Sequence, residues 1–190
     1  MRLDQAFSDS FTRFPDSPAI IEGNRACTYS QLHARVERLA GALASRGVSS
    51  GDHVVYVSAN STVFAELTLA CSRIGAVCEI HNIRLSDQTL LELIARSGAS
   101  LAVLSADAWD RLGPHLPSSG SIETTVVFGH EEDLLDDAIP YEEFLEGAPA
   151  PPNQKPADDE DPVLMMFTSG TTGTPKGVLF SHRAIANRIA

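Results

Sequence analysis

Near its carboxyl end the sequence reads Phe167-Thr168-Ser169-Gly170-Thr171-Thr172-Gly173-Thr174-Pro175-Lys176-Gly177. This stretch follows an apolar run from Val163 to Phe167 and precedes a second apolar run from Val178 to Phe180. Short apolar runs bounded by glycine and proline are typical of strands. We therefore predict a loop between two strands.

The loop is rich in groups that bind anions. Three glycines leave backbone N–H groups accessible, five hydroxyl residues add donors, and Lys176 adds a positive charge. Successive N–H groups form concave anion sites, so this composition favours a polyphosphate ligand. The alternative is a flexible polar hairpin loop without a ligand. The loop differs from the P-loop of nucleotide hydrolases, because Pro175 precedes the lysine and Gly177 follows it in place of a hydroxyl residue.

The eleven-residue string closely resembles the phosphate-binding signature of the adenylate-forming, or AMP-binding, superfamily. That family includes acyl-CoA synthetases, aryl-acid ligases, luciferases and the adenylation domains of peptide synthetases. The resemblance implies that the loop holds the β- and γ-phosphates of ATP, with Thr171, Thr172 and Lys176 as the main side-chain contacts. The expected ATP phosphate-binding residues are Thr168, Ser169, Gly170, Thr171, Thr172, Gly173, Thr174, Pro175, Lys176 and Gly177.

Upstream of the loop, apolar patterns of period two and period 3.6 alternate along the chain. They predict an α/β fold, in which a parallel-rich sheet is flanked by helices. Helix caps are expected at Ser30, at Asn60 or Ser61, and at Ser86. The predicted helices span 3–14, 30–46, 61–74, 86–97, a turn around 109–112 and a helix opened by 181–182; the predicted strands span 19–22 and 25–29 (a hairpin), 53–57, 77–80, 101–104, 124–128, 163–167 and 178–180, with a loop over 113–121.

Further segments extend the resemblance over nearly all 190 residues. Thr28-Tyr29-Ser30-Gln31-Leu32 resembles the family's early Thr-Tyr-x-x-Leu signature, and Asn82-Ile83-Arg84-Leu85 resembles a segment common in acyl-CoA synthetases. The second match implies a fatty or related carboxylic acid as substrate. The sequence departs from the family pattern just before Asn82, where Ile80-His81 replaces the usual proline and leucine. A structural role for His81 is favoured over a ligand role.

The resemblance implies that this chain is the amino-terminal subdomain of an AMP-binding domain. Later family segments, with the Tyr-Gly-x-Thr-Glu and Thr-Gly-Asp motifs, do not occur among residues 1–190. Within this incomplete domain, residues 147–162 hold five of the eleven prolines and end in an acidic run, which predicts a solvated linker. Residues 163–190 then form the phosphate-loop segment.

The charge is distributed unevenly along the chain. Residues 131–161 hold twelve acidic residues and one basic residue, which accounts for the whole net charge of −11, whereas residues 162–190 hold three basic residues and no acidic one. A small anionic ligand suits this pattern better than a long nucleic acid. The three cysteines lack metal-ligand spacing. Neither a signal peptide nor an apolar run of membrane-spanning length is evident, so the cytosol is the expected compartment.

By resemblance, a substrate carboxylate attacks the α-phosphate of ATP, pyrophosphate leaves with Mg²⁺, and a thiol such as coenzyme A then accepts the acyl group. No residue of this segment is assigned a definite catalytic role. His182 matches a family histidine near the acyl pocket, and the alternative for it is an ordinary helix-start residue. We expect the chain to be inactive without the carboxyl-terminal segments of the enzyme. Two alternatives stay open: a non-catalytic nucleotide-binding module, and one half of a split ligase.

Overall fold

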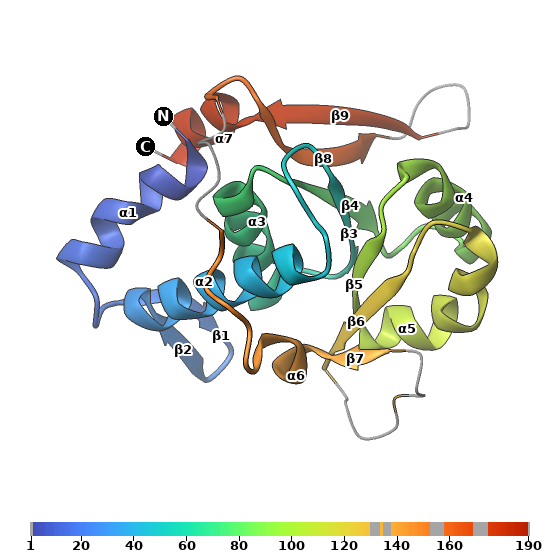
Figure 1. The fold of residues 1–190 in the computed structure, drawn as a ribbon, viewed down its shortest axis with the longest axis horizontal. Helices are drawn as coiled ribbons and strands as arrows, with labels where there is room; N and C mark the ends of the chain where they lie inside the picture. Colours follow the sequence, from blue (N-terminus) through green and yellow to red (C-terminus); the bar gives the residue numbers. More distant parts are fainter. Residues whose placement is uncertain (1, 130–133, 135–137, 153–157, 169–174, 190) are drawn as a thin grey trace.

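The computed structural model describes residues 2–129, 134, 138–152, 158–168 and 175–189 (Figure 1). The strands and helices alternate along much of the chain. The helices are α1 Leu3–Arg13, α2 Tyr29–Ser45, α3 Thr62–Ile74, α4 Asp87–Ser97, α5 Ala106–Leu112, the 3₁₀ helix Gly113–Ser119, α6 Tyr141–Leu145 and α7 His182–Ile189. The strands are β1 Pro18–Glu22, β2 Arg25–Thr28, β3 His53–Ser58, β4 Val77–Asn82, β5 Leu101–Ser105, β6 Thr124–Phe128, β7 Ile139–Pro140, β8 Pro162–Thr168 and β9 Lys176–Ser181.

The main sheet has seven strands in the order β7-β6-β5-β3-β4-β8-β9. All neighbouring pairs are parallel except β8 and β9, which pair antiparallel. The short antiparallel hairpin β1–β2 lies apart from it. The predicted α/β class with a parallel-rich sheet is therefore confirmed, and so is the hairpin over 18–28.

Helices cover both faces of this sheet, and the alternation of side chains along β3 shows how. Val54 and Tyr56 join a core with α2 and α3, whereas Val55 and Val57 join a second core with α4 and α5. Because both faces of the strand are buried, its sequence is apolar at every central position. In Figure 1, α4 and α5 lie on one side of the strands, and α2 and α3 on the other.

Most helix ends follow the predicted caps, and one does not. The Ser86 side chain accepts a hydrogen bond from Thr89 N, and Gly98 closes α4 in the left-handed conformation, as predicted. The start of α2 differs, because Thr28 is its cap in place of Ser30. Thr28 Oγ1 accepts from Gln31 N, and the Gln31 side chain accepts from Thr28 N. This reciprocal pair satisfies two backbone donors, which a cap at Ser30 would leave to water.

Two regions were predicted incompletely. Residues 113–119 form a 3₁₀ helix where a loop was expected. Strand β7 and helix α6, over 139–145, were not predicted at all. Both elements are very short, so neither shows enough apolar periodicity to be recognised from sequence.

A buried ionic cluster attaches α6 to α2 and α3. Arg35 Nε lies 2.6 Å from Glu66 Oε1, and its two terminal nitrogens donate to the Glu142 carboxylate at 2.9 and 2.7 Å. The Tyr141 hydroxyl donates to Glu66 Oε2 at 2.6 Å. Glu66 is 2% exposed and Tyr141 is 1% exposed. The cluster compensates the charge of a carboxylate that would otherwise be costly to bury.

The first part of the predicted linker lies against α2. A Cβ atom at Gly41 would lie 1.8 Å from the carbonyl oxygen of Pro149, so only glycine fits at this contact. We expect Gly41→Ala to lower the free energy of unfolding by about 1–3 kcal/mol, because the backbone of the 148–151 segment must move. Urea denaturation followed by circular dichroism measures this change.

Ala34→Gly is the matched control, because Ala34 is exposed on the same helix. In a helix, alanine is favoured over glycine by about 1 kcal/mol, so this variant should lose about that amount. If Gly41→Ala instead raises the free energy of unfolding by about the amount that Ala34→Gly lowers it, helix propensity alone explains the effect at position 41. The close contact with Pro149 is then refuted.

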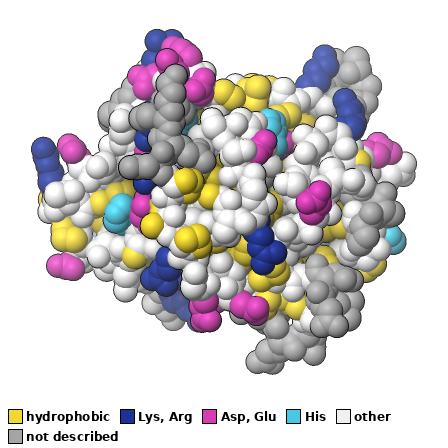
Figure 2. Space-filling model, viewed as in Figure 1, with side chains coloured by type: hydrophobic (Ala, Val, Ile, Leu, Met, Phe, Trp, Pro, Cys, Tyr) yellow, Lys and Arg dark blue, Asp and Glu magenta, His cyan; other side chains and the backbone are white. Residues whose placement is uncertain are grey.

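The surface of the described part mixes polar and apolar groups. Figure 2 shows acidic, basic and hydrophobic side chains interspersed over one face. Within the ranges that the structure describes, no helix is long and apolar enough to cross a membrane.

Candidate functional site

The predicted loop is attached to the antiparallel hairpin of β8 and β9. In the register of this hairpin Phe167 is opposite Gly177 and Thr168 is opposite Lys176. The Thr168 hydroxyl donates to the Lys176 carbonyl oxygen at 3.4 Å. Thr168 and Lys176 therefore form the base of the loop, and both are exposed.

Of the predicted phosphate-binding residues, the structure brings together Thr168, Pro175, Lys176 and Gly177 at this base. Residues 169–174, which include the predicted contacts Thr171 and Thr172, lie outside the described residues. The loop begins at the carboxyl end of β8, which is parallel to β4 and so ends at the same edge of the sheet. Open α/β sheets bind their ligands at this edge.

A groove of about 600 Å³ opens beside the loop base, between α4 and the hairpin. Met165 and Phe167 of β8 supply apolar surface, Arg96 and Lys176 supply positive charge, and Glu79 supplies a carboxylate. This combination of groups can bind an organic anion, with its charged part near the two cations.

Glu79 lies in a buried cluster with two histidines. Its Oε2 is 2.6 Å from His53 Nδ1, and its Oε1 is 3.0 Å from His81 Nε2. Burial would raise the pKa of Glu79, but the interactions with His53 and His81 outweigh it and lower that pKa. The hydrogen bond to Glu79 raises the pKa of His53, although burial opposes it. The cluster therefore favours an ionised Glu79 beside a protonated His53.

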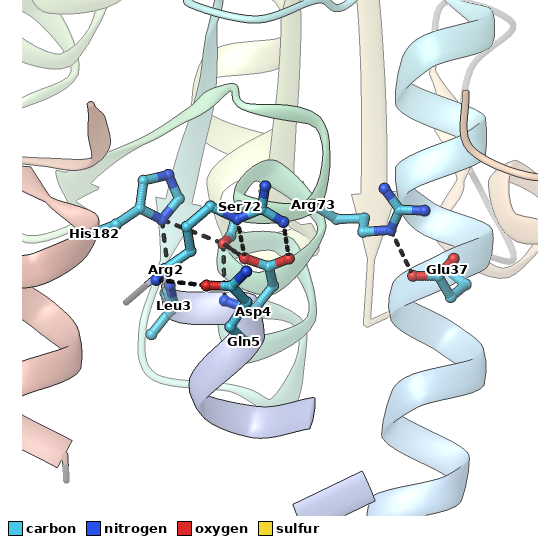
Figure 3. A network of polar contacts seen from close by, with 8 residues as sticks. All are labelled: Arg2, Leu3, Asp4, Gln5, Glu37, Ser72, Arg73 and His182. Atoms are coloured by element: carbon cyan, nitrogen blue, oxygen red, sulfur yellow. Dashed lines mark hydrogen bonds and ion pairs between the residues drawn. The ribbon is translucent and has the colours of Figure 1, made fainter. Parts of the chain in front are cut away.

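His182 lies at the other end of β9, about 20 Å of extended strand from Lys176. Its imidazole is fully buried, and Figure 3 shows it pointing toward the start of α1 and toward Ser72 of α3. Leu3 N donates to its Nδ1 at 3.3 Å, and Ser72 Oγ lies 3.4 Å from the same atom. In this arrangement His182 joins α7 to α1 and α3. The acyl-pocket role suggested by its position in the sequence stays a prediction.

The pH dependence of stability should report on His182. Burial lowers its pKa, while Asp4 acts in the opposite direction. An unfolded histidine titrates near pH 6.5. Below about that pH the unfolded chain is protonated at this residue, whereas folded His182 stays neutral to a lower pH. Because the unfolded state then binds more protons, the free energy of unfolding falls. In His182→Asn the amide oxygen replaces the Nδ1 acceptor without titrating. We expect the wild type to lose more unfolding free energy than this variant when urea titrations at about pH 7.5 and about pH 5.5 are compared.

His33→Asn is the control for this measurement, because His33 is exposed on α2. It should keep the wild-type difference between the two pH values. Equal pH dependence in the wild type and in His182→Asn would contradict a depressed His182 pKa.

The sequence argument missed part of the site. Glu79 and His53 were not singled out, and Arg96 was not connected to the loop. A signal exists in the pattern Glu79-x-His81, since two ionisable residues on one face of an otherwise apolar strand need partners. His53 and Arg96 carry no comparable signal, because their place beside the others depends on the strand order and on the position of α4.

Comparison with known proteins gives a consistent result. A family model described as AMP-binding enzyme matches residues 7–190. Feruloyl-CoA synthase from Amycolatopsis sp is 34% identical over 168 residues, which cover 88% of this chain and 31% of that protein. Fatty acid–[acyl-carrier-protein] ligase ScoC from Streptomyces coeruleorubidus is 33% identical over 173 residues, covering 90% of this chain and 31% of that protein. The chain thus spans about a third of the length of these relatives.

A solved structure agrees with the sequence relatives. The inhibitor-bound N-terminal domain of FACL13 from Mycobacterium tuberculosis superimposes with a TM-score of 0.79 at 26% identity. The match covers 95% of this chain and 44% of that chain.

Proposed function

The chain belongs to the family of AMP-binding enzymes, and from this membership we propose that it is part of an ATP-dependent ligase that activates a carboxylic acid. In the proposed reaction a carboxylate oxygen attacks the α-phosphorus of ATP, and the bond from that phosphorus to the bridging oxygen breaks. Pyrophosphate leaves and an acyl-adenylate forms. A thiol, such as that of coenzyme A, then takes the acyl group and releases AMP.

The observation that carries this proposal is the glycine- and hydroxyl-rich loop at the carboxyl end of β8, with Lys176 at its base. Phosphoryl transfer depends mainly on positioning and on charge stabilisation. The loop would hold the β- and γ-phosphates, and the Lys176 ammonium would stabilise the charge of the departing pyrophosphate. The reacting acid and the α-phosphate would meet beyond the loop, in a region to which other segments of the enzyme contribute.

The proposed Mg²⁺ would be bound through the ATP phosphates. Within the described ranges, no group of three or more histidine, cysteine or acidic side chains could hold a metal ion. The proposal assigns no step to a protein-bound metal. When bound with ATP, the ion would supply further positive charge to the phosphates.

Two finer points belong to the same proposal. The acid is a fatty or related carboxylic acid, which the Asn82–Leu85 segment and the name of the Streptomyces relative support, whereas the name of the Amycolatopsis relative supports an aromatic acid. The chain alone is inactive, which is supported by its span of about a third of those relatives. The cytosolic location expected from sequence stays a prediction.

ATP–pyrophosphate exchange tests the proposal. The assay uses the longer protein that contains this chain, with a panel of fatty and aromatic acids and ATP-Mg. We expect exchange that requires one class of carboxylic acid. Absence of exchange with every acid would refute the ligase proposal.

Calorimetry of the chain alone with ATP-Mg tests the inactivity separately. A loop without the surrounding segments must lose its own conformational entropy on binding, so weak or undetectable binding is expected. Tight binding by the chain alone would instead support the nucleotide-binding module.

A further inference from the structure

We propose that His81 and Glu79 of β4 are positioning residues for the phosphate loop, and that they act through Phe167 of β8. This inference rests on the proposed function, in which the loop binds ATP. The residues involved lie on the face of the sheet that points toward α4, from β3 across β4 and β8 to β9.

The register of the sheet places His81 beside the start of the loop. Glu79 pairs with Met165 and Ile80 with Met166, so the next pair in the parallel ladder is His81 and Phe167. The two rings are stacked, with centroids 4.7 Å apart and planes inclined by 28°. Phe167 is followed directly by Thr168, the first residue of the loop base.

On its other side, the Phe167 side chain lies next to β9. A Cβ atom at Gly177 would lie 1.9 Å from Met165 Cε and 3.5 Å from Phe167 Cε1, so these two side chains extend over the glycine. Because β8 lies between β4 and β9, Phe167 has His81 on one side and Gly177 on the other. A displacement of His81 would therefore be transmitted to both ends of the loop.

His81 is itself enclosed by buried neighbours, with its imidazole against the Glu79 carboxylate. Its imidazole is fully buried and its Nε2 lies 3.0 Å from Glu79 Oε1, while the other Glu79 oxygen is held by His53 at 2.6 Å. The Glu79 carboxylate is 1% exposed, and its hydrogen bond to His53 offsets part of the cost of burying it, while His81 fills the space beside its other oxygen. A leucine at position 81 could fill the space but could not interact with Glu79.

The position also differs from the pattern that the rest of the chain resembles, in which proline and leucine precede the asparagine. The alternative is that His81 only packs the core. That alternative predicts a general loss of stability, whereas a positioning role predicts a local effect at the loop base.

Hydrogen exchange measured by mass spectrometry separates these two outcomes without any ligand. In His81→Ala we expect at least about tenfold faster exchange in the peptides over 163–168 and 175–181, with β3 and β5 unchanged, because amides that open locally exchange without global unfolding. His81→Phe keeps the stacked ring but loses the contact with Glu79, so it should restore only part of the protection. Ile80→Val is the matched control, because Ile80 is the neighbouring residue on the opposite face of the same strand.

If His81→Ala does not fold, Glu79→Gln gives the same test, since it keeps the shape of the side chain and removes its charge. Wild-type exchange rates at the loop base in the variant that folds, or equal acceleration in all strands, would overturn the inference.

A kinetic measurement then connects the effect to ATP. In the pyrophosphate exchange assay with the longer protein, His81→Ala should raise the KM for ATP several-fold while the KM for the acid stays the same, with partial rescue in His81→Phe. An unchanged KM for ATP in an active His81→Ala enzyme would also overturn the inference. If the wild type shows no exchange with any acid, the ligase proposal fails, and hydrogen exchange still decides whether His81 positions the loop base.

Discussion

Lys176→Ala should lower kcat/KM for ATP by about 10–100-fold in the pyrophosphate exchange assay. A hydrogen bond to a charged group contributes about 1.5–3 kcal/mol, and each 1.4 kcal/mol corresponds to about a factor of ten. The Lys176 side chain is exposed at the start of β9, so its removal should cost little stability. The effect is expected on ATP and on pyrophosphate, because the ammonium is proposed to interact with the phosphates and not with the acid.

Arg183→Ala is the matched control for this variant. Arg183 belongs to the same basic segment, but it forms an exposed ion pair with Glu160 next to α7. Its loss removes one positive charge without changing the loop, so kcat/KM should change by less than about twofold, as for most exposed ion pairs. Lys176→Arg keeps the charge and should retain part of the activity. If Lys176→Ala and Arg183→Ala have equal effects, the loop lysine has no specific role in ATP binding.

Much of the sheet could be predicted from sequence because its strands are buried on both faces. The runs at 54–57, 101–104 and 126–128 are apolar at consecutive positions, and each helix between them has a cap or a closing glycine. Local chemistry of this kind does not depend on partners that are distant in the sequence. The cap prediction was wrong at the start of α2. Ser30 and Thr28 are both good cap residues, and only the reciprocal contact with Gln31 distinguishes them.

The candidate site was less accessible to prediction for a physical reason. The composition of the loop, with its glycines, hydroxyls and a lysine, predicts an anion site, and that site stays a prediction. The surroundings of the loop depend on register. Glu79 meets His53 from β3 and His81 stacks on Phe167 from β8, although Phe167 is 86 positions further along the sequence. No local pattern encodes which strand lies next to β4.

Two buried carboxylates of the described residues, Glu66 and Glu79, occupy separate parts of the fold. Glu66 and Glu79 lie on opposite sides of the sheet, and each is compensated by cationic partners from another element. The Glu79 cluster lies beside the loop base, whereas the Glu66 cluster fixes α6 at the other end of the sheet. The two clusters share no residue, so their variants should have additive effects on stability.

Arg35→Met should lower the free energy of unfolding by about 3–5 kcal/mol at neutral pH, because it leaves the buried Glu66 carboxylate without its cation. Methionine keeps most of the apolar stem, so packing changes little. Hydrogen bonds to Glu142 raise the pKa of Arg35, although burial opposes them, so the guanidinium is charged beside Glu66. Urea denaturation followed by circular dichroism gives the change in unfolding free energy.

The double variant Arg35→Met/Glu66→Gln tests whether the uncompensated Glu66 carboxylate causes the loss of stability. Glutamine removes the buried charge, and its side-chain oxygen can still accept the Tyr141 hydroxyl hydrogen bond, so most of the lost stability should return. Arg73→Met is the control, because Arg73 pairs with Glu37 between the same two helices, with both side chains about one third exposed. It should cost less than about 1 kcal/mol. If Arg35→Met costs no more than Arg73→Met, Glu66 is either protonated or hydrated in the folded chain, and the buried ionic cluster does not hold α6 in place.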